Sequence, residues 1–264
     1  MKIIKKIWAV FLPALALCFF TFGFLFAPND PDFVDMTLRF LPPCRQYPLG
    51  TDNLGRCVFS RILYGGKTTL GIILLGSVLV IFLGLVLGLP LGSSRGKIKL
   101  FLESLLNAVT AIPPIAYLII FISVMGNGVR TMLIAVVLSI LLRMVKLVKT
   151  RTEVELGKAY VLSAITSGAG RFHILFKDIL PNVLWDVMHF ILLSAADMVI
   201  TIVSFSFIGL GMGDDIIDWG VMIADLHHYI ISHPGLTLYP VIAIVLSALS
   251  FNILGRAVEK EVAD

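Results

Sequence analysis

The sequence predicts an all-α integral membrane protein with six transmembrane helices. Of its 264 residues, 58% are hydrophobic and 14% charged, and the mean hydropathy is +0.97. Soluble domains are about 45–50% apolar and about 25% charged, and a soluble chain of this length has no core large enough to hide the excess. Six stretches reach the roughly 20 apolar residues that a spanning helix needs: about 7–27, 69–92, 105–126, 131–148, 183–210 and 236–255.

The first apolar stretch follows Lys2, Lys5 and Lys6, and in this it is similar to a secretory signal peptide. The stretch is long and rich in phenylalanine, however. It ends at Phe26-Ala27-Pro28-Asn29 without the small-x-small pattern of a cleavage site. We therefore expect a retained first span.

The segment between the first two spans is expected to carry a short helix. Thr51 or Asp52 has a side chain suited to cap a helix N-terminus. Five apolar residues behind it would share one helical face: Leu54, Val58, Phe59, Ile62 and Leu63. We predict that this interfacial helix lies along the outer membrane surface.

The second and third spans carry features of packing. Gly84, Gly88 and Gly92 recur at every fourth residue, a stripe that lets another helix backbone approach closely. Pro113-Pro114 interrupts the third span and removes two backbone donors, which predicts a bend.

Lysine and arginine are unevenly distributed between the two sides of this topology. With the N-terminus inside, segments 1–6, 93–104, 143–182 and 256–264 hold 15 basic residues, and the outer segments hold 6. The positive-inside rule then places both termini in the cytoplasm. The net charge of +4 does not indicate a nucleic-acid partner, because the basic residues are scattered between apolar runs instead of gathered in a patch with aromatics.

The segment between the fourth and fifth spans is too long for a simple connection. A helix over about 153–166 is followed by Gly168-Ala169-Gly170, where glycine permits a reversal, and by a second helix over 171–180 that ends at Pro181. We expect a stiff hairpin that projects into the cytoplasm and has small residues at its tip. A merely solvated loop would expose six apolar side chains: Tyr160, Val161, Phe172, Ile174, Leu175 and Phe176.

Two acids, Asp186 and Asp197, lie inside apolar runs. A charge at mid-bilayer costs at least about 2.5–3.5 kcal/mol, so it usually faces a partner or a water-filled path. Asp186 is close enough to Pro181 to reach the inner interface. Asp197 lies deeper and has two interpretations: it lines a translocation path together with Met198 and Thr201, or it pairs with a polar group of a neighbouring subunit.

The sequence gives weak grounds for metal binding or catalysis. His227 and His228 could contact a metal-bearing cargo, but adjacent helical residues point to different faces, and solvated histidines are the simpler interpretation. Gly211-Met212-Gly213-Asp214 fits the Gly-x-Gly-Asp pattern of intramembrane aspartyl proteases, which pair two carboxylates. On a continuous helix Asp197 would lie about 25 Å from Asp214, at 1.5 Å per residue, too far for such a pair.

Ser163-Ala164, Gly168 and Leu180-Pro181 form a pattern that is similar to the cytoplasmic "EAA" loop in permease subunits of binding-protein-dependent ABC importers. Further blocks are similar to the second permease of dipeptide, oligopeptide and nickel importers: residues 48–56 (Pro-Leu-Gly-Thr-Asp-Asn-Leu-Gly-Arg), 206–211 (Ser-Phe-Ile-Gly-Leu-Gly), 218–223 (Asp-Trp-Gly-Val-Met-Ile), Pro240 and 251–255 (Phe-Asn-Ile-Leu-Gly). The glutamate that opens the EAA pattern is Leu162 here, and the first alanine is Ser163.

The resemblance implies a type I ABC importer permease fold in the bacterial inner membrane, without chemistry of its own. It implies a heterodimer with a second permease, two ATPase subunits that hold ATP and magnesium, and an extracytoplasmic solute-binding protein. The predicted topology divides the chain into three parts: 1–68 with the first span and the external segment with its interfacial helix, 69–255 as a five-helix core with the cytoplasmic coupling hairpin 149–181, and the cytoplasmic tail 256–264. The residues that would couple to an ATPase are Tyr160, Ser163, Ala164, Gly168, Ala169, Gly170 and Phe172.

The cargo follows from smaller similarities. Residues 167–170 and 219–223 resemble nickel or metallophore permeases more than peptide permeases, so we expect nickel or another transition metal, free or metallophore-bound. Import of dipeptides or oligopeptides by the same architecture is the alternative. A proton-coupled carrier built around Asp197 is the rival from another class, but such carriers commonly have internal repeats with paired broken helices, which we do not find in the sequence.

Overall fold

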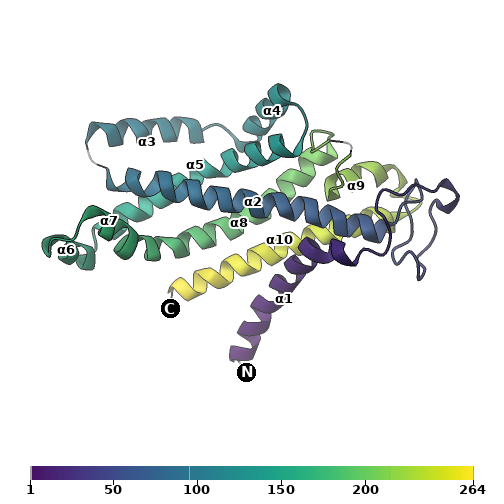
Figure 1. Cartoon of the computed structure of the whole chain (residues 1–264), viewed down its shortest axis with the longest axis horizontal. Helices are drawn as coiled ribbons and strands as arrows, with labels where there is room; N and C mark the ends of the chain where they lie inside the picture. The colour runs from purple at the N-terminus through teal and green to yellow at the C-terminus, as the bar shows by residue number, and fades with distance from the viewer. Residues whose placement is uncertain (1, 95, 214, 264) are drawn as a thin grey trace. The chain divides into compact units, whose positions relative to one another are not determined.

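The structure is a computed structural model that describes residues 2–94, 96–213 and 215–263. Every regular element in these ranges is helical, apart from an isolated antiparallel bridge between Thr51 and Cys57. The α-helices (Figure 1) are α1 (Lys2–Phe22), α2 (Val58–Ser93), α3 (Lys97–Thr110), α4 (Pro114–Met125), α5 (Val129–Leu156), α6 (Ala159–Thr166), α7 (Arg171–His173), α8 (Leu180–Phe207), α9 (Trp219–Leu226) and α10 (Pro234–Ala263). Short 3₁₀ turns are η1 (Gly23–Phe26), η2 (Met36–Leu38) and η4 (His227–Tyr229), and η3 (Ile174–Ile179) is a π-helix.

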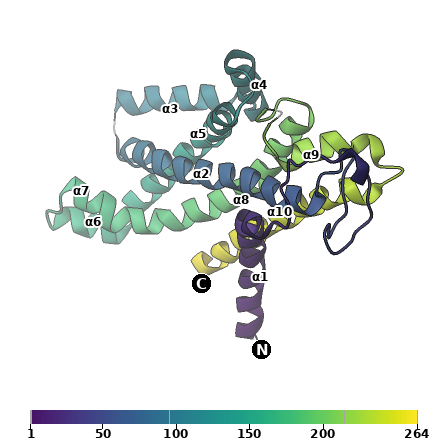
Figure 2. The same ribbon diagram turned by 45° about the vertical axis from the view of Figure 1, so that its right-hand side comes forward.

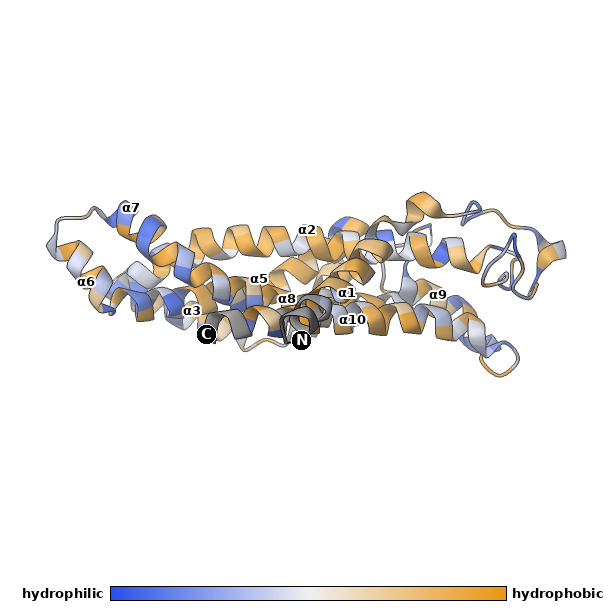
Figure 3. Cartoon of the chain, turned by 90° about the horizontal axis from the view of Figure 1, so that it is seen from below, coloured by the Kyte–Doolittle hydropathy of each residue, from blue (hydrophilic) through white to orange (hydrophobic). Residues whose placement is uncertain are grey.

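Four helices of the described residues are long and apolar enough to cross a membrane. They are Val58–Ser93, Val129–Leu156, Arg171–Phe207 and Pro234–Glu259, and Figure 3 shows apolar residues along most of their length. They correspond to the second, fourth, fifth and sixth predicted spans. The first predicted span falls on a shorter apolar helix, Val10–Phe26, so the count of six stays a prediction.

The third predicted span is broken into two helices instead of bent. Helix α3 ends at Thr110, and α4 begins at Pro114. Two successive prolines cannot donate the backbone hydrogen bonds that a continuous helix would need there, whereas a proline in the first turn leaves no bond unmade. The physical cause was therefore identified correctly, but its effect on the helix was underestimated.

The chain divides into two compact units. The first consists of Met1–Leu75, Met125–Leu133 and Ala195–Leu254, and the second of Gly76–Val124, Ile134–Ser194 and Gly255–Asp264. Each unit therefore combines segments that are distant in sequence. The three-part division expected from the sequence follows position relative to the membrane and stays a prediction.

In the first unit Trp219 joins α9 to α1 and α2. Its side chain is completely buried, and its indole N–H donates to the Ile62 carbonyl at 3.0 Å. The ring of Phe20 meets it edge-on, with 5.4 Å between centroids. Gly65 leaves room for the indole, since a Cβ there would lie 2.8 Å from Trp219 Cδ1. A buried aromatic with its polar atom satisfied fixes these elements strongly.

In the second unit the glycine stripe of α2 packs closely against another helix, as predicted, and that helix is α5. A Cβ at Gly88 would lie 2.6 Å from Val148 Cβ, and one at Gly92 would lie 2.6 Å from Thr152 Cβ. Gly84 faces Met144 in the same way. The small residues therefore bring the two helices into close contact, which confirms the sequence-based interpretation.

The predicted interfacial helix is not a separate element. Helix α2 begins at Val58 and continues without interruption to Ser93, so the apolar face assigned to a surface helix belongs to the first turns of a long helix. Thr51 and Asp52 do not cap it. Both are buried, and Asp52 accepts hydrogen bonds from the backbone of Leu54 at 2.8 Å and of Arg56 at 3.0 Å, which closes a turn.

Candidate functional site

The hairpin between α5 and α8 has the reversal that the sequence predicts. Gly168 has φ of +84°, a conformation that glycine adopts without steric penalty. The Gly168 N–H donates to the Ile165 carbonyl and the Ala169 N–H to the Ala164 carbonyl, both at 3.0 Å. These two bonds are a Schellman motif, which ends α6 and satisfies its last carbonyls. Figures 1 and 2 both show α6 and α7 beside the start of α8.

Both arms of the hairpin differ from the prediction. The first arm is not one helix from 153, because α5 ends at Leu156 and α6 begins at Ala159. The second arm does not end at Pro181, because the chain stays helical from Arg171 to Phe207. The π-helix Ile174–Ile179 precedes the proline, and the Leu180 N–H donates to the Leu175 carbonyl. This wider turn carries the helix past a residue that lacks a donor.

Hydrogen bonds at the base of the hairpin join its two arms. The hydroxyl of Tyr160 donates to Glu155 Oε2 at 2.6 Å, and Lys158 Nζ lies 2.6 Å from Glu155 Oε1. Asn182 Nδ2 donates to the Tyr160 hydroxyl at 3.0 Å and to the Asp178 carbonyl at 2.8 Å. The end of α5, the start of α6, the end of η3 and the start of α8 are therefore tied together, which restricts their relative movement.

This base network also affects the ionisation of Tyr160. Burial, followed by the hydrogen bond and the negative charge of Glu155, raises the pKa of the Tyr160 phenol to about 12. The phenol is therefore a stable donor throughout the physiological range. A charged hydrogen bond of this kind is stronger than one between neutral groups.

The outer surface of the hairpin is apolar. Phe172 is 74% exposed, and its ring stacks on Phe176 with 4.3 Å between centroids. Leu162 and Ile165 on α6 are also exposed, whereas Val161 and Ile174 are buried between the arms. Ser163, Gly168 and Gly170 are exposed, and Ala164 and Ala169 are partly exposed. The predicted coupling residues therefore lie on one hairpin, with small residues next to aromatic ones.

The three predicted path residues of α8 do not share one face. Asp197 is exposed, and Thr201 is partly exposed one turn later. Thr201 Oγ1 donates to the Asp197 carbonyl at 2.8 Å. Met198 is 1% exposed, so it does not share the exposed face of Asp197. Exposed Ser204 continues the polar face toward the end of the helix. The Asp197 carboxylate has no hydrogen-bond or ion-pair partner among the described residues.

The two candidate metal-binding histidines differ from the sequence-based expectation. His227 and His228 lie in the 3₁₀ turn η4, and their ring centroids are 3.7 Å apart, so they do not point to different faces. His227 Nδ1 is 2.7 Å from the Ala224 carbonyl. The described residues contain no group of three side chains suited to hold a metal ion.

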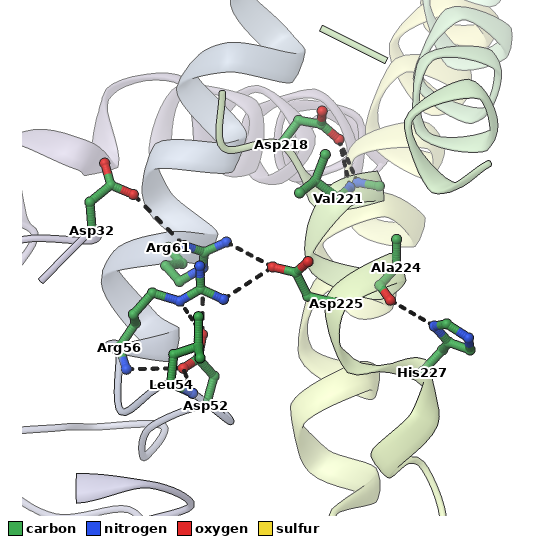
Figure 4. Close-up of polar contacts among 11 residues, drawn as sticks. Asp32, Asp52, Leu54, Arg56, Arg61, Asp218, Val221, Ala224, Asp225 and His227 are labelled. Atoms are coloured by element: carbon green, nitrogen blue, oxygen red, sulfur yellow. Dashed lines mark hydrogen bonds and ion pairs between the residues drawn. The ribbon is translucent and has the colours of Figure 1, made fainter. Parts of the chain in front are cut away.

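A charged cluster in the first unit was not predicted. Its members are Asp32, Asp52, Arg56, Arg61 and Asp225 (Figure 4). Arg56 Nε binds Asp52 Oδ2 at 2.7 Å, and its Nη2 binds Asp225 Oδ2 at 3.1 Å. Arg61 has a side chain only 4% exposed and reaches the same Asp225 oxygen at 3.4 Å. The cluster therefore links the segment before α2 to α9.

Beside the charged cluster lies a cavity of about 610 Å³. Its wall includes Asp32, Asn53, Arg56, Arg61, Asp215 and Asp225. We call it the cluster cavity. On the same helix as Asp225, Asp218 caps α9 by accepting from the Gly220 N–H at 2.6 Å and the Val221 N–H at 3.1 Å. Burial raises the pKa of the Asp218 carboxyl, and these donors, with the Ser206 side chain, oppose the rise.

Little in the sequence could reveal the charged cluster, because its two halves are separated by more than 160 residues. Arg56 lies at the end of the block 48–56 that carries the family resemblance, but Asp225 lies in a segment singled out only for its histidines. The role of Glu155 and Asn182 at the hairpin base was equally hidden. Asp214, the acid of the Gly-x-Gly-Asp pattern, lies outside the described residues.

A family model described as "Binding-protein-dependent transport system inner membrane component" matches residues 81–264. This chain belongs to that family. It is 30% identical over 230 residues to the nickel transport system permease protein NikC of Escherichia coli (strain K12), covering 87% of this chain and 83% of NikC. It is 31% identical over 247 residues to the peptide transport system permease protein SapC of Escherichia coli O6:H1, covering 91% of this chain and 83% of SapC.

The fold agrees with this assignment. A chain of the MetNI methionine ABC transporter in inward-facing conformations superposes with a TM-score of 0.60, at 16% sequence identity, over 76% of this chain and 96% of that chain. The protein is thus an ABC importer permease of the dipeptide, oligopeptide and nickel family, with the type I fold, and a multi-pass component of the inner membrane. The family implies ATPase and solute-binding protein partners. The protease and carrier alternatives are set aside.

Proposed function

We propose that this permease forms half of a translocation path, with a second permease subunit as the other half, in an importer driven by two ATPase subunits. ATP and Mg²⁺ are held by those subunits, and this chain binds no cofactor of its own. Six spans, with both termini and the hairpin 158–181 in the cytoplasm, fit the excess of basic residues in the inner segments. The hairpin docks into a groove of one ATPase subunit.

The observation that carries the docking proposal is the surface of the hairpin. Exposed Phe172 and Phe176 stack next to a turn of small residues closed by a Schellman motif. Aromatic side chains are typical energetic anchors of protein interfaces, and small residues let two backbones approach. The proposed topology puts Phe172 and Phe176 in the cytoplasm, and an exposed apolar patch of this kind on a water-facing surface needs a protein partner.

The base network supports transmission of movement from the ATPase to the helices. Glu155 lies on the helix that precedes the hairpin and Asn182 on the one that follows it, and Tyr160 is bonded to both. A displacement of the docked tip therefore reaches α5 and α8 together. Without these bonds the tip could move while the long helices stayed in place.

The polar face of α8 supports the position of the translocation path. Asp197, Thr201 and Ser204 are spaced to share one side of the helix. Asp197 has no partner within the described part of the chain, and burying an unpaired carboxylate in lipid is unfavourable. A water-filled path, or a polar group of the second permease, meets this requirement, and we propose the path.

A bulky residue at the tip tests the docking proposal. Gly170 has open space around it and φ of −69°, so Gly170→Trp adds bulk without backbone strain. In the assembled complex we expect it to abolish ATP-dependent uptake and cargo-stimulated ATP hydrolysis. Gly128→Trp, at another open glycine outside the hairpin, is the matched control and keeps both activities. Wild-type uptake by the Gly170 variant would refute docking through this turn.

We propose nickel or another transition metal, free or metallophore-bound, as the cargo, supported by the similarity to NikC. Di- or oligopeptides are the second candidate, supported by the equal similarity to SapC. Vesicles that contain the complete complex and its binding protein separate the two. Uptake of radioactive nickel that an excess of dipeptide does not inhibit supports the first candidate, and the opposite result supports the second.

A further inference from the structure

The cluster cavity contains more negative than positive charge. Four carboxylates lie in or around it, those of Asp32, Asp52, Asp215 and Asp225, against the guanidinium groups of Arg56 and Arg61. Each guanidinium group is already within 4 Å of more than one carboxylate. Both guanidinium groups are therefore neutralised by carboxylates of the cluster, and the cavity as a whole keeps an excess of negative charge.

The cavity also has unused hydrogen-bond acceptors. Asn53 Oδ1 is buried on its wall and has no donor among the described residues. Asp215 has no ion pair there either, and Asp32 has only a 3.8 Å contact with Arg61. A buried carbonyl oxygen without a donor is unfavourable, because it has lost its hydrogen bonds to water and gained none in the protein. A group that carries only donors and a positive charge would satisfy all three residues.

The floor of the cavity is fixed, and its rim is accessible. Arg61 is almost completely buried and reaches Asp225 at 3.4 Å, whereas the side chain of Asp32 is 69% exposed. The cavity is larger than a single side chain, so a visiting group can enter and leave together with water. Charge pairs at such a partly exposed rim favour rapid, reversible and salt-sensitive association more than tight binding.

We propose that the cluster cavity receives a lysine or arginine side chain of the extracytoplasmic solute-binding protein. The inference rests on the proposed topology, which places residues 28–68 and 211–235 outside the membrane. A binding protein is the partner for which this family is named, and it must dock and dissociate in every transport cycle. The acceptor-rich rim of the cavity matches the charge and the reversibility that this contact needs.

The test measures the dissociation constant of the cognate binding protein from the complete complex in lipid nanodiscs, at low and at high salt. The double variant Asp32→Asn, Asp215→Asn keeps the shape of the rim and removes two charges. We expect its binding to be about tenfold weaker at low salt and to depend less on salt than wild-type binding. Asp35→Asn is the matched control, because it removes an acid of the same segment outside the cavity and asparagine still caps η2.

Each outcome decides the inference. Equal weakening in the control would assign the effect to general attraction and overturn the cavity as the contact. Unchanged or tighter binding of the double variant would also overturn it, and tighter binding would indicate an anionic visitor instead. If only cargo affinity falls, the cavity contacts cargo and not the binding protein. If the wild-type complex binds no binding protein at all, the proposed function itself fails.

Discussion

The charged cluster and the hairpin use polar and apolar residues in opposite ways. In the cluster, charges are inside: Arg61 is buried among carboxylates, and Trp219 packs close by on the same helix, α9, that carries Asp225. On the hairpin, apolar groups are outside: Phe172 and Phe176 are exposed, and the polar contacts lie at the base. The buried charges of the cluster are paired within this chain, and only its exposed rim has acceptors to spare, whereas the whole apolar surface of the hairpin is incomplete without a partner.

This difference implies that the two regions respond differently to mutation. A substitution in the cluster should act on the folding of this chain, because it leaves buried charges without partners. A substitution on the outer face of the hairpin should act on assembly, because its side chains contribute little to the chain's own core. Four predictions test this contrast.

The largest expected effect is that of Arg61→Met. Removal of the buried guanidinium leaves Asp225 and Asp52 with fewer partners, and breaking a buried ion pair costs about 3–5 kcal/mol. We expect a large decrease in thermal stability of the purified chain in detergent. Arg45→Met, at an exposed arginine, should change the unfolding free energy by less than about 0.5 kcal/mol. If the two variants unfold alike, the cluster is not the fixed region that the comparison requires.

The next effect is on assembly. Phe172→Ala removes a ring that is 74% exposed, so the stability of the chain should change by less than about 0.5 kcal/mol. Affinity for the ATPase should nevertheless decrease by roughly thirtyfold, because interface anchors contribute about 2 kcal/mol or more. Co-purification and titration with the ATPase measure this. Ile231→Ala, at an even more exposed apolar residue outside the hairpin, should leave the affinity unchanged, and a decrease there would count against the hairpin as the specific contact.

A substitution at the base of the hairpin should affect neither the folding of the chain nor ATPase binding strongly, but the coupling between them. Tyr160→Phe removes one hydroxyl bonded to Glu155 and Asn182, at a cost of about 1 kcal/mol. We expect fewer cargo molecules transported per ATP hydrolysed, at nearly normal ATPase binding. Tyr64→Phe is the control, since that hydroxyl makes no hydrogen bond among the described residues. An unchanged transport ratio for the Tyr160 variant would show that the network has no part in coupling.

Much of the fold could be predicted because it depends on local patterns. Long apolar stretches indicated the four helices that are long enough to span, the glycine stripe indicated a close helix contact without naming its partner, and Gly168 indicated the reversal of the hairpin. Predictions failed where a local signal has more than one structural outcome. Pro113-Pro114 breaks the helix instead of bending it, and Pro181 is accommodated by the π-helix before it.

The site could be predicted only in part, for a related reason. The tip of the hairpin is contiguous in sequence, so its small and aromatic residues were visible together. The charged cluster joins Arg61 to Asp225, and the base network joins Glu155 to Asn182 across the hairpin. Pairings of this kind depend on how distant elements pack, and no spacing in the sequence encodes them.

The smallest effect concerns the cap of α9. Burial raises the pKa of Asp218 above its usual 3.8, so the folded state holds this proton more tightly than the unfolded state does. Its contribution to stability is therefore present at low pH and is lost as pH rises through the folded pKa. Asparagine also caps helices and has no charge to bury. Asp218→Asn should thus gain stability over the wild type as pH rises from acidic to neutral, by less than about 1 kcal/mol. Unfolding of both proteins across this pH range measures the difference in unfolding free energy between the variant and the wild type. If the variant loses stability relative to the wild type as pH rises, the pKa of Asp218 is not raised by burial.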